Sequence, residues 1–368
     1  MRALSILQVL LGLSALLCGC GARSSLVSGG DEGTVGGGHG TGRTLSASWS
    51  HSCAIVEHGK VVCWGQWGAT PATPSPILIG GLDRIVEIAA GENGDCARRA
   101  DGTVWCWGVS TGGEPVQIQG AKFSSFTTGA GASCGVTGSG VACVGAPFLD
   151  GASCNIGLKG WSPTATTVPG LSGVAGLSVG QWHACAFAPG GATSCWGCAG
   201  GPPPEGKWNL GSMVPNTLTP VAVPGVSSTV LLAAETSSTC AVQTNGDTIC
   251  WGEGLQFGPG IVAHPIGPTL AGFPPSPLDL DVGVTFSCAA YPGEVRCLGG
   301  IPTFADGCMD RRDLPTSFSL ADIAELSVGY QHVCARDTSG AVWCWGCNTV
   351  GEVGDGTKTP RGEPVRVL

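Results

Sequence analysis

The sequence predicts an all-β protein, and more narrowly a seven-bladed β-propeller, from three observations. A unit with two cysteines about ten residues apart, accompanied by glycine and often tryptophan, recurs seven times, and such a repeat indicates a repeat architecture. The 325 residues from 44 to 368 give about 46 residues per unit, which is the length of a four-stranded propeller blade. Glycine is frequent, with 63 residues, whereas charged residues make up only 12% of the chain. This composition favours short strands joined by tight turns over helices.

The unit is clearest in its last copy, residues 326–346, which read LSVGYQHVCARDTSGAVWCWG. Leu326 and Val328 alternate with smaller or polar residues, as in a half-buried strand. Asp337 and Gly340 delimit a stretch with the residues of a tight turn. Residues 341–345 are β-branched and aromatic, as expected of a return strand. Each copy is therefore predicted to be a β-hairpin with one cysteine on each arm.

The first 20 residues predict a signal peptide rather than part of the fold. Arg2 is their only charge, and residues 3–17 form an apolar run that is too short to span a bilayer. The segment at residues 17–20, Leu-Cys-Gly-Cys, resembles a bacterial lipobox, which implies that Cys20 becomes the acylated N-terminus. An ordinary cleaved signal with a free Cys20 is the alternative, and Cys18 could compete as the modified residue.

Residues 21–43 are rich in glycine and serine and predict a flexible tether that leads to a folded domain at 44–368. Gly21 follows the lipobox cysteine in place of an aspartate. By the lipobox resemblance, this favours an exported lipoprotein of the outer membrane or cell surface over retention at the inner membrane. A secreted or periplasmic protein is the alternative.

The remaining cysteines predict disulfides. Without Cys18 and Cys20 there are eighteen, an even number in a chain with an export signal. Fourteen pair within hairpins, because directly opposed residues of neighbouring strands come close enough to bridge. The hairpin pairs are Cys53–Cys63, Cys96–Cys106, Cys134–Cys143, Cys185–Cys195, Cys240–Cys250, Cys288–Cys297 and Cys334–Cys344. The other four are Cys154, Cys198, Cys308 and Cys347, in the connections after units three, four, six and seven. For these we hypothesise staples between neighbouring blades, Cys154–Cys198 and Cys308–Cys347.

The repeat pattern G-x-x-H-x-C-A … G-x-V-x-C-W-G resembles the repeats of the regulator of chromosome condensation (RCC1-like) family. Residues 345–357, WGCNTVGEVGDGT, are close to the family's W-G-x-N-x-x-G-Q-L-G-D-G-T. The resemblance covers residues 44–368 and implies a seven-bladed β-propeller. Units three and six depart from it, with Val144 and Leu298 in place of the tryptophan. The paired cysteines are unlike the eukaryotic members and resemble secreted bacterial ones.

The C-terminal segment suggests how the ring closes. Residues 363–367, Glu-Pro-Val-Arg-Val, resemble residues 219–223, Thr-Pro-Val-Ala-Val, which precede unit five. We interpret both as the first strand of a blade. The C-terminal strand is therefore expected to pair into blade one and to cover both open sheet edges, which would otherwise promote aggregation.

Charge and motifs limit the ligands. The net charge of −9 opposes a nucleic-acid partner and direct docking to anionic lipid, so membrane contact is expected only through the N-terminal lipid. The CxxC pairs at 195–198 and 344–347 could hold zinc, but disulfide partners are already available, and no metal or cofactor is predicted. Residues 355–357, Asp-Gly-Thr, are interpreted as a turn rather than half of a calcium loop. His51, His183 and His332 are interpreted as hydrogen-bonding backbone within or between blades rather than as ligands.

Two groups stand out among the twelve tryptophans. Five of them recur at one position of the unit, which indicates packing. Four others, which are not bound to the repeat, are the candidates for binding: Trp67, Trp161, Trp182 and Trp208.

No motif of a hydrolase, zinc protease or phosphate-binding loop is present, so the chain is predicted to be no enzyme. The predicted function is a cell-envelope-anchored, monomeric protein-binding scaffold for an unknown protein partner. Loops at 144–180 and 197–230 would carry specificity. Two alternatives remain open. The family resemblance raises guanine-nucleotide exchange, and secreted propellers with similar repeats raise inhibition of an extracellular or periplasmic hydrolase.

Overall fold

The computed structural model describes residues 42–368 except for 68–70, 109–110, 131, 146–161, 199–208, 212–215, 253–265, 300, 304–307, 309 and 313–315. The predicted signal peptide with Cys20, and most of the predicted tether, lie outside the described residues. No helix within the described ranges is long and apolar enough to cross a membrane.

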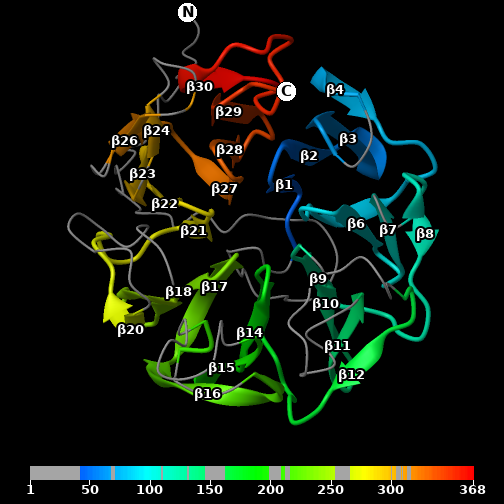
Figure 1. The fold of residues 1–368 in the computed structure, drawn as a ribbon, viewed down its shortest axis with the longest axis vertical. Helices are drawn as coiled ribbons and strands as arrows, with labels where there is room; N and C mark the ends of the chain where they lie inside the picture. The colour runs from blue at the N-terminus through cyan, green and yellow to red at the C-terminus, as the bar shows by residue number, and fades with distance from the viewer. Residues whose placement is uncertain are drawn as a thin grey trace, which may run out of the picture. The chain divides into compact units, whose positions relative to one another are not determined.

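The described chain forms seven four-stranded antiparallel sheets, each built from strands that pair in chain order (Figure 1). Blade one has β1 (Leu45–Ala47), β2 (His51–Val56), β3 (Lys60–Gly65) and β4 (Thr73–Leu78), with the 3-10 turn η1 (Glu57–Gly59) between β2 and β3. Blade two has β5 (Ile85–Ala89), β6 (Gly94–Arg99), β7 (Val104–Gly108) and β8 (Val116–Gln117). Blade three has β9 (Ser125–Thr128), β10 (Ala132–Thr137), β11 (Gly140–Gly145) and β12 (Thr166–Val168). Blade four has β13 (Gly176–Val179), β14 (His183–Phe187), β15 (Ala192–Gly197) and β16 (Thr217–Ser227).

Blade five has β17 (Thr229–Glu235), β18 (Ser238–Gln243), β19 (Thr248–Gly252) and β20 (Ile266–Leu270). Blade six has β21 (Asp279–Val282), β22 (Phe286–Tyr291), β23 (Glu294–Gly299) and β26 (Thr316–Ser319), with a separate hairpin of β24 (Ile301–Thr303) and β25 (Asp310–Arg312) inserted before β26. Blade seven has β27 (Ile323–Val328), β28 (His332–Asp337), β29 (Val342–Gly346) and β30 (Arg361–Arg366).

The first strands of the blades surround the axis of a closed ring. They contact one another in the order β1, β5, β9, β13, β17, β21 and β27, and β27 contacts β1 again. The predicted seven-bladed β-propeller is therefore confirmed. The ring has two faces because strand direction alternates within each blade. The loop face is the end of the ring that carries the connections between first and second strands and those between third and fourth strands. We call the opposite end the turn face.

Most of the core lies between neighbouring blades. Each recurrent tryptophan sits on the third strand of one blade and packs into the preceding blade, as Trp107 packs against Val61 of blade one. Trp251 packs in the same way against Leu232 and Val223, which belong to blades five and four. All five recurrent tryptophans are almost fully buried, so the repeat position marks packing, as predicted.

The disulfides of all seven hairpins are present, with Cα–Cα distances of 4.0–4.1 Å. In each hairpin the two cysteines are directly opposed in the strand register, as Cys53 is with Cys63. The hypothesised staple Cys308–Cys347 is also present and joins the connection of blade six to blade seven. Cys198 is disulfide-bonded, and its hypothesised partner Cys154 lies outside the described residues.

The expected pairing of the C-terminal strand with blade one is wrong. The last strand, β30, pairs with β29 of its own blade, and blade one is complete with β1 as its innermost strand. The Thr-Pro-Val-Ala-Val segment at 219–223 lies within β16, the outermost strand of blade four. Such segments therefore end a blade rather than begin one. Because every blade has four strands of its own, with the hairpin β24–β25 inserted in blade six, no blade needs a strand from the C-terminus.

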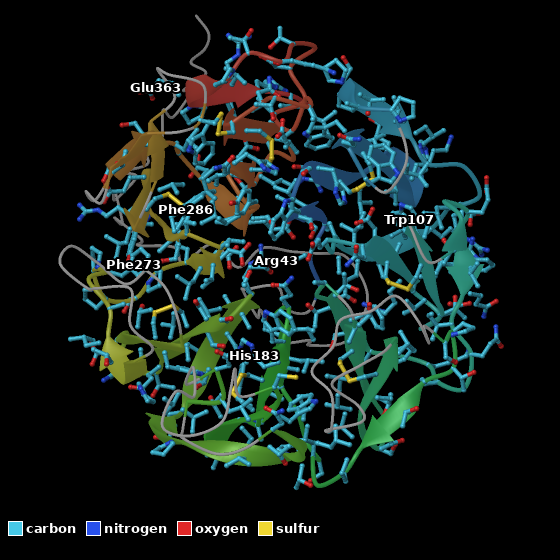
Figure 2. All side chains as sticks on the ribbon, in the orientation of Figure 1. Arg43, Trp107, His183, Phe273, Phe286 and Glu363 are labelled. Carbon is cyan, nitrogen blue, oxygen red and sulfur yellow. A yellow bond between two sulfur atoms is a disulfide. The ribbon has the colours of Figure 1, made fainter. Side chains whose placement is uncertain are left out.

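The N-terminal clasp, residues 42–44, contributes to closing the ring instead. Arg43 is buried, and Figure 2 shows it near the middle of the ring. Its Nη2 donates to Asp279 Oδ1 of blade six at 2.9 Å, and its Nη1 donates to the carbonyl of Leu326 in blade seven. Its own carbonyl accepts a hydrogen bond from the backbone of Ile88 in blade two at 2.8 Å. One residue thus joins three blades.

The neighbours of Arg43 extend the clasp. The backbone N–H of Gly42 donates to Glu87 of blade two. The backbone N–H of Thr44 donates to Glu325 Oε1 of blade seven at 2.8 Å, and its hydroxyl donates to Glu325 Oε2 at 2.6 Å. Since this segment leads directly into β1, it connects blade one to the blades on both sides at the turn face.

A second set of hydrogen bonds repeats around the axis. The side chain of an inner-strand residue in one blade accepts a hydrogen bond from a backbone N–H of the next blade at 2.8–2.9 Å. The acceptors are Ser327, Ser46, Ser178 and Asp281. These bonds satisfy backbone groups that the ring interior would otherwise leave unpaired.

Candidate functional site

The candidate site is a ring of residues on the loop face, close to the axis. In every blade the first hairpin cysteine pairs with the inner-strand residue seven positions earlier, as Cys53 does with Ser46 and Cys334 with Ser327. The residues four positions before these cysteines are therefore equivalent. We call them the axial rim: Trp49, Glu92, Ala130, Gln181, Thr236, Val284 and Tyr330, in blades one to seven.

An aromatic pair forms one side of the rim. Trp49 and Tyr330 belong to the adjacent blades one and seven, and their rings are stacked, with centroids 4.5 Å apart and planes 3° apart. The backbone N–H of Tyr330 also donates to the carbonyl of Ser48 at 3.3 Å. Trp49 is 36% exposed and Tyr330 is half-buried. The loop face therefore carries a flat aromatic surface at a position where most other blades have a smaller side chain.

A carboxylate follows the aromatic pair along the rim. Glu92 Oε2 accepts a hydrogen bond from Gln181 Nε2 at 3.0 Å, which links blade two to blade four. Burial raises the pKa of Glu92, and the hydrogen bond from Gln181 acts in the opposite direction.

Glu235 breaks a glycine pattern beside the rim. The residue that precedes each rim position is Gly91, Gly129, Gly180, Gly283 or Gly329 in five blades, Ser48 in blade one and Glu235 in blade five. The blades approach closely at this position, since a Cβ on Gly129 would lie 2.2 Å from the carbonyl oxygen of Gly180. Burial raises the pKa of Glu235 to about 8, and the negative charges of Asp281 and Glu92 act in the same direction.

This raised pKa makes stability depend on pH. Because the carboxyl binds its proton more tightly in the folded state, its contribution to stability is present below pH 4.5 and is lost as pH rises to about 8. Glu235→Gln removes this carboxyl group. Between pH 6.5 and pH 9, we expect the variant to lose less free energy of unfolding than the unaltered protein, by on the order of 2 kcal/mol. Urea unfolding at both pH values measures this difference. Glu363→Gln, an exposed site on β30 (Figure 2), is the control, and an equal response of both variants would contradict the assignment.

The three repeat histidines fasten neighbouring blades. Each forms a hydrogen bond through Nε2 with a side chain of the next blade. These bonds join His51 to Asp95 Oδ1 at 2.7 Å, His183 to Thr239 Oγ1 at 2.6 Å and His332 to Ser52 Oγ at 2.7 Å. All three are buried, and burial lowers the pKa of His183 to about 4 and that of His332 to about 3. The hydrogen bonds run between blades, as interpreted from the sequence, but these partners are side chains rather than backbone.

Two possible metal sites are occupied by protein groups. His51, Cys53 and Asp95 lie close together, but Cys53 is bonded to Cys63 and cannot act as a thiolate ligand. The second possible site is the turn at residues 355–357. Asp355 Oδ1 accepts hydrogen bonds from the backbone and hydroxyl of Thr357 at 3.0 and 2.7 Å.

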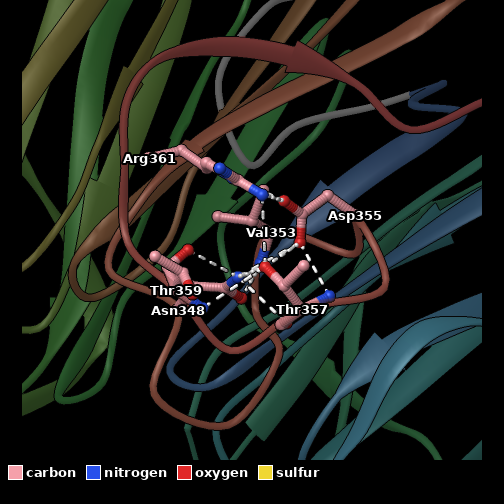
Figure 3. A network of polar contacts seen from close by, with 6 residues as sticks. All are labelled: Asn348, Val353, Asp355, Thr357, Thr359 and Arg361. Carbon is pink, nitrogen blue, oxygen red and sulfur yellow. Dashed lines mark hydrogen bonds and ion pairs between the residues drawn. The ribbon is translucent and has the colours of Figure 1, made fainter.

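The network of the 348–361 loop is shown in Figure 3. Arg361 Nε donates to Asp355 Oδ2 at 2.5 Å. Asn348, which is fully buried, donates through Nδ2 to the carbonyls of Thr357 and Thr359, both at 3.0 Å, and accepts from the backbone N–H of Val353. The carboxylate of Asp355 therefore holds a turn in place, in agreement with the interpretation from the sequence.

The candidate tryptophans do not come together in the described structure. Trp67 is buried in the core between blades one and two, which removes it from the accessible surface. Trp182 is half-buried and packs against the cluster of blades three and four, one residue after Gln181 of the rim. Trp161 and Trp208 lie outside the described residues. Sequence reasoning missed Trp49 and Glu235, which an alignment of the seven units on their first cysteines would have singled out.

Solved structures with the same fold are similar to this chain. Prp20p from Saccharomyces cerevisiae, described with its binding to Gsp1p and histones, has 19% identity and a TM-score of 0.69 over 90% of this chain and 88% of that chain. Yeast RCC1 (Prp20) in complex with Kap60 has 17% identity and a TM-score of 0.68 over 94% and 90% of the two chains. Human WBSCR16 has 18% identity and a TM-score of 0.66 over 80% and 84%. At these identities the similarity concerns the fold.

A family model adds evidence from the sequence. The model described as "Regulator of chromosome condensation (RCC1) repeat" matches residues 43–66 and 323–352. These two segments resemble RCC1 repeats. They contain the first three strands of blades one and seven, which meet where the ring closes. No curated protein matches the chain by sequence.

Proposed function

We propose that this RCC1-like propeller is a non-enzymatic protein-binding scaffold that uses its loop face. The observation that carries the proposal is the exposed Trp49–Tyr330 stack on the axial rim. Aromatic residues are enriched in the centres of protein interfaces because they bury a large area with few rotatable bonds. A ring held by hairpin disulfides presents such a surface in a fixed shape, which lowers the entropic cost of binding.

Further observations support a binding role. Of the predicted specificity loops at 144–180 and 197–230, residues 146–161, 199–208 and 212–215 lie outside the described residues. The buried histidines are committed to hydrogen bonds between blades, which makes them unsuited to proton transfer with a substrate. Yeast RCC1 (Prp20), which shares the fold, is bound to a protein, Kap60, in its structure.

The proposed location is the cell envelope, with Cys20 as the lipid anchor and the propeller as a monomer. The eight disulfides of the described structure support an oxidising compartment. The same disulfides disfavour the alternative of guanine-nucleotide exchange inside a reducing cytosol.

Site-specific photo-crosslinking tests the proposal. A benzophenone amino acid replaces Trp49 on the loop face in one variant and Ser339, an exposed turn-face residue, in a control variant. We expect a discrete crosslinked protein from position 49 in intact cells and none from position 339. Crosslinks at position 339 alone, or none at either position, would overturn the proposal. A hydrolase or a nucleotide-binding protein as the captured partner would favour the corresponding alternative.

A further inference from the structure

We propose that the axial rim recognises a basic segment of the partner protein, and that a lysine or arginine side chain lies against the Trp49–Tyr330 stack and pairs with the carboxylates of Glu92 and Glu235. This inference rests on the proposed scaffold function and names the chemistry of its partner. It is carried by the charge of the rim, the accessible aromatic surface and polar groups without protein partners.

The rim is acidic at the level of the sequence. Seven short segments surround the axis on this face: 48–50, 91–93, 129–130, 180–182, 235–237, 283–285 and 329–331. They contain two carboxylates, Glu92 and Glu235, and no lysine, arginine or histidine. Arg43, the basic residue near the axis, lies at the opposite end of the inner strands and is paired with Asp279. An approaching cation therefore meets a negative field on the loop face.

The aromatic pair adds a second kind of attraction. A cation over the face of a tryptophan is attracted by the ring quadrupole, and tryptophan is the best aromatic residue for this contact. Tyr330 stacks on one face of Trp49 and so fixes the plane of the indole ring. Glu92 follows Trp49 directly in the order of the blades, which places an aromatic ring and a carboxylate on neighbouring positions of the rim.

Two polar groups at the rim lack protein partners. The hydroxyl of Thr236, which follows Glu235, is buried and has no hydrogen-bond partner within the described ranges. Glu92 accepts the bond from Gln181 through Oε2, and no described residue donates to its Oε1. A side chain with several N–H groups, such as lysine or arginine, can donate hydrogen bonds to these two oxygens.

A lysine or arginine fits this combination better than a bare metal ion. A metal ion uses carboxylate oxygens but gains little from a stacked aromatic surface, whereas an ammonium or guanidinium group uses both. An acidic partner would be repelled by Glu92, and a purely apolar partner would leave Glu92 Oε1 without a donor. The rim therefore favours a basic protein segment.

Peptide binding to the full-length protein tests the inference. The probe is a hexa-arginine peptide, with a hexa-glutamate peptide as the comparison, and binding is followed by calorimetry and by tryptophan fluorescence. We expect hexa-arginine alone to bind. At pH 9, where Glu235 is ionised, Trp49→Ala, Glu92→Gln and Glu235→Gln should each weaken binding about tenfold, equivalent to about 1.4 kcal/mol. Glu363→Gln removes the same charge from an exposed site on β30 and should change the affinity less than twofold.

The pH dependence provides a readout specific to the rim. Since Glu235, which faces Glu92 and Asp281, ionises only as pH rises to about 8, hexa-arginine should bind more tightly at pH 9 than at pH 6.5. Glu235→Gln should reduce this difference. Arginine keeps its charge throughout this range, so the difference reports on the protein.

Three results would overturn the inference. Glu363→Gln could weaken binding as much as Glu92→Gln, which would indicate general charge attraction. Trp49→Ala could leave the affinity unchanged. Calcium at equimolar concentration could displace the peptide, which would indicate a metal site. Crosslinking from a benzophenone amino acid at position 284, which lies on the same rim and leaves Trp49 in place, that hexa-arginine does not compete with would retain the scaffold function while rejecting a basic partner. Circular dichroism of each variant verifies that the propeller is folded.

Discussion

Arg43→Met is expected to lower the free energy of unfolding by about 3–5 kcal/mol, because it leaves a buried carboxylate without its partner. Arg43 and Asp279 are both almost fully buried and form an ion pair at 2.9 Å. Burial raises the pKa of Asp279 to about 6, and the charge of Arg43 acts in the opposite direction. Methionine has a similar length but supplies no donor. Equilibrium unfolding in guanidinium chloride measures the loss.

The sign of the pH effect provides a further check on Arg43. Without the guanidinium, the folded-state pKa of Asp279 rises further, so stability is lost as pH rises through this higher value. The deficit of Arg43→Met should therefore be larger at pH 8 than at pH 5. Adding Asp279→Asn removes the buried charge and should recover part of the loss. A deficit below about 1 kcal/mol, or one that does not change with pH, would show that the clasp does not depend on this pair.

Trp345→Ala is the second large effect, with an expected loss of about 3–5 kcal/mol in the free energy of unfolding. The Trp345 ring is buried between blades six and seven, and its centroid lies 5.1 Å from the centroid of the Phe318 ring. Removing the indole ring leaves a cavity, because the two sheets are too rigid to move together and fill it. The disulfide Cys308–Cys347 still joins these two blades, so the expected loss comes from their packing and not from their covalent connection.

Trp343 provides the matched comparison for this substitution. It lies two residues earlier on the same strand, β29, and is partly exposed. Trp343→Ala removes the same side chain from the same hairpin, so both variants keep the disulfide Cys334–Cys344. We expect Trp343→Ala to lose less than half as much stability. Equal losses would mean that strand propensity, rather than packing between blades, determines the effect. Equilibrium unfolding in guanidinium chloride measures both losses.

Much of the propeller could be predicted because its unit is local. The two cysteines of each hairpin lie nine or ten residues apart, and a tight turn between two short strands brings them opposite each other whatever surrounds them. The same holds for the turn around Asp355, whose partners Thr357 and Arg361 lie within six residues. Local geometry and a sevenfold repeat were enough for the blade number and for these pairs.

The order of strands within a blade could not be predicted in the same way. The segments Leu-Ser-Ala at 45–47 and Thr-Pro-Val-Ala-Val at 219–223 both alternate as half-buried strands do. Only contacts with the other six blades decide which lies near the axis and which at the edge. The choice of the wrong strand led to the mistaken pairing of the C-terminus with blade one.

The sequence by itself determined seven disulfide hairpins, a seven-bladed ring and the structural role of the recurrent tryptophans. Tertiary structure alone decided how the ring closes and where its accessible surface lies. Trp49 and Trp67 both stand outside the recurrent tryptophan position, yet one is exposed on the axial rim and the other is buried between blades. Their difference arises because neighbouring blades, distant in sequence, cover one ring and leave the other open.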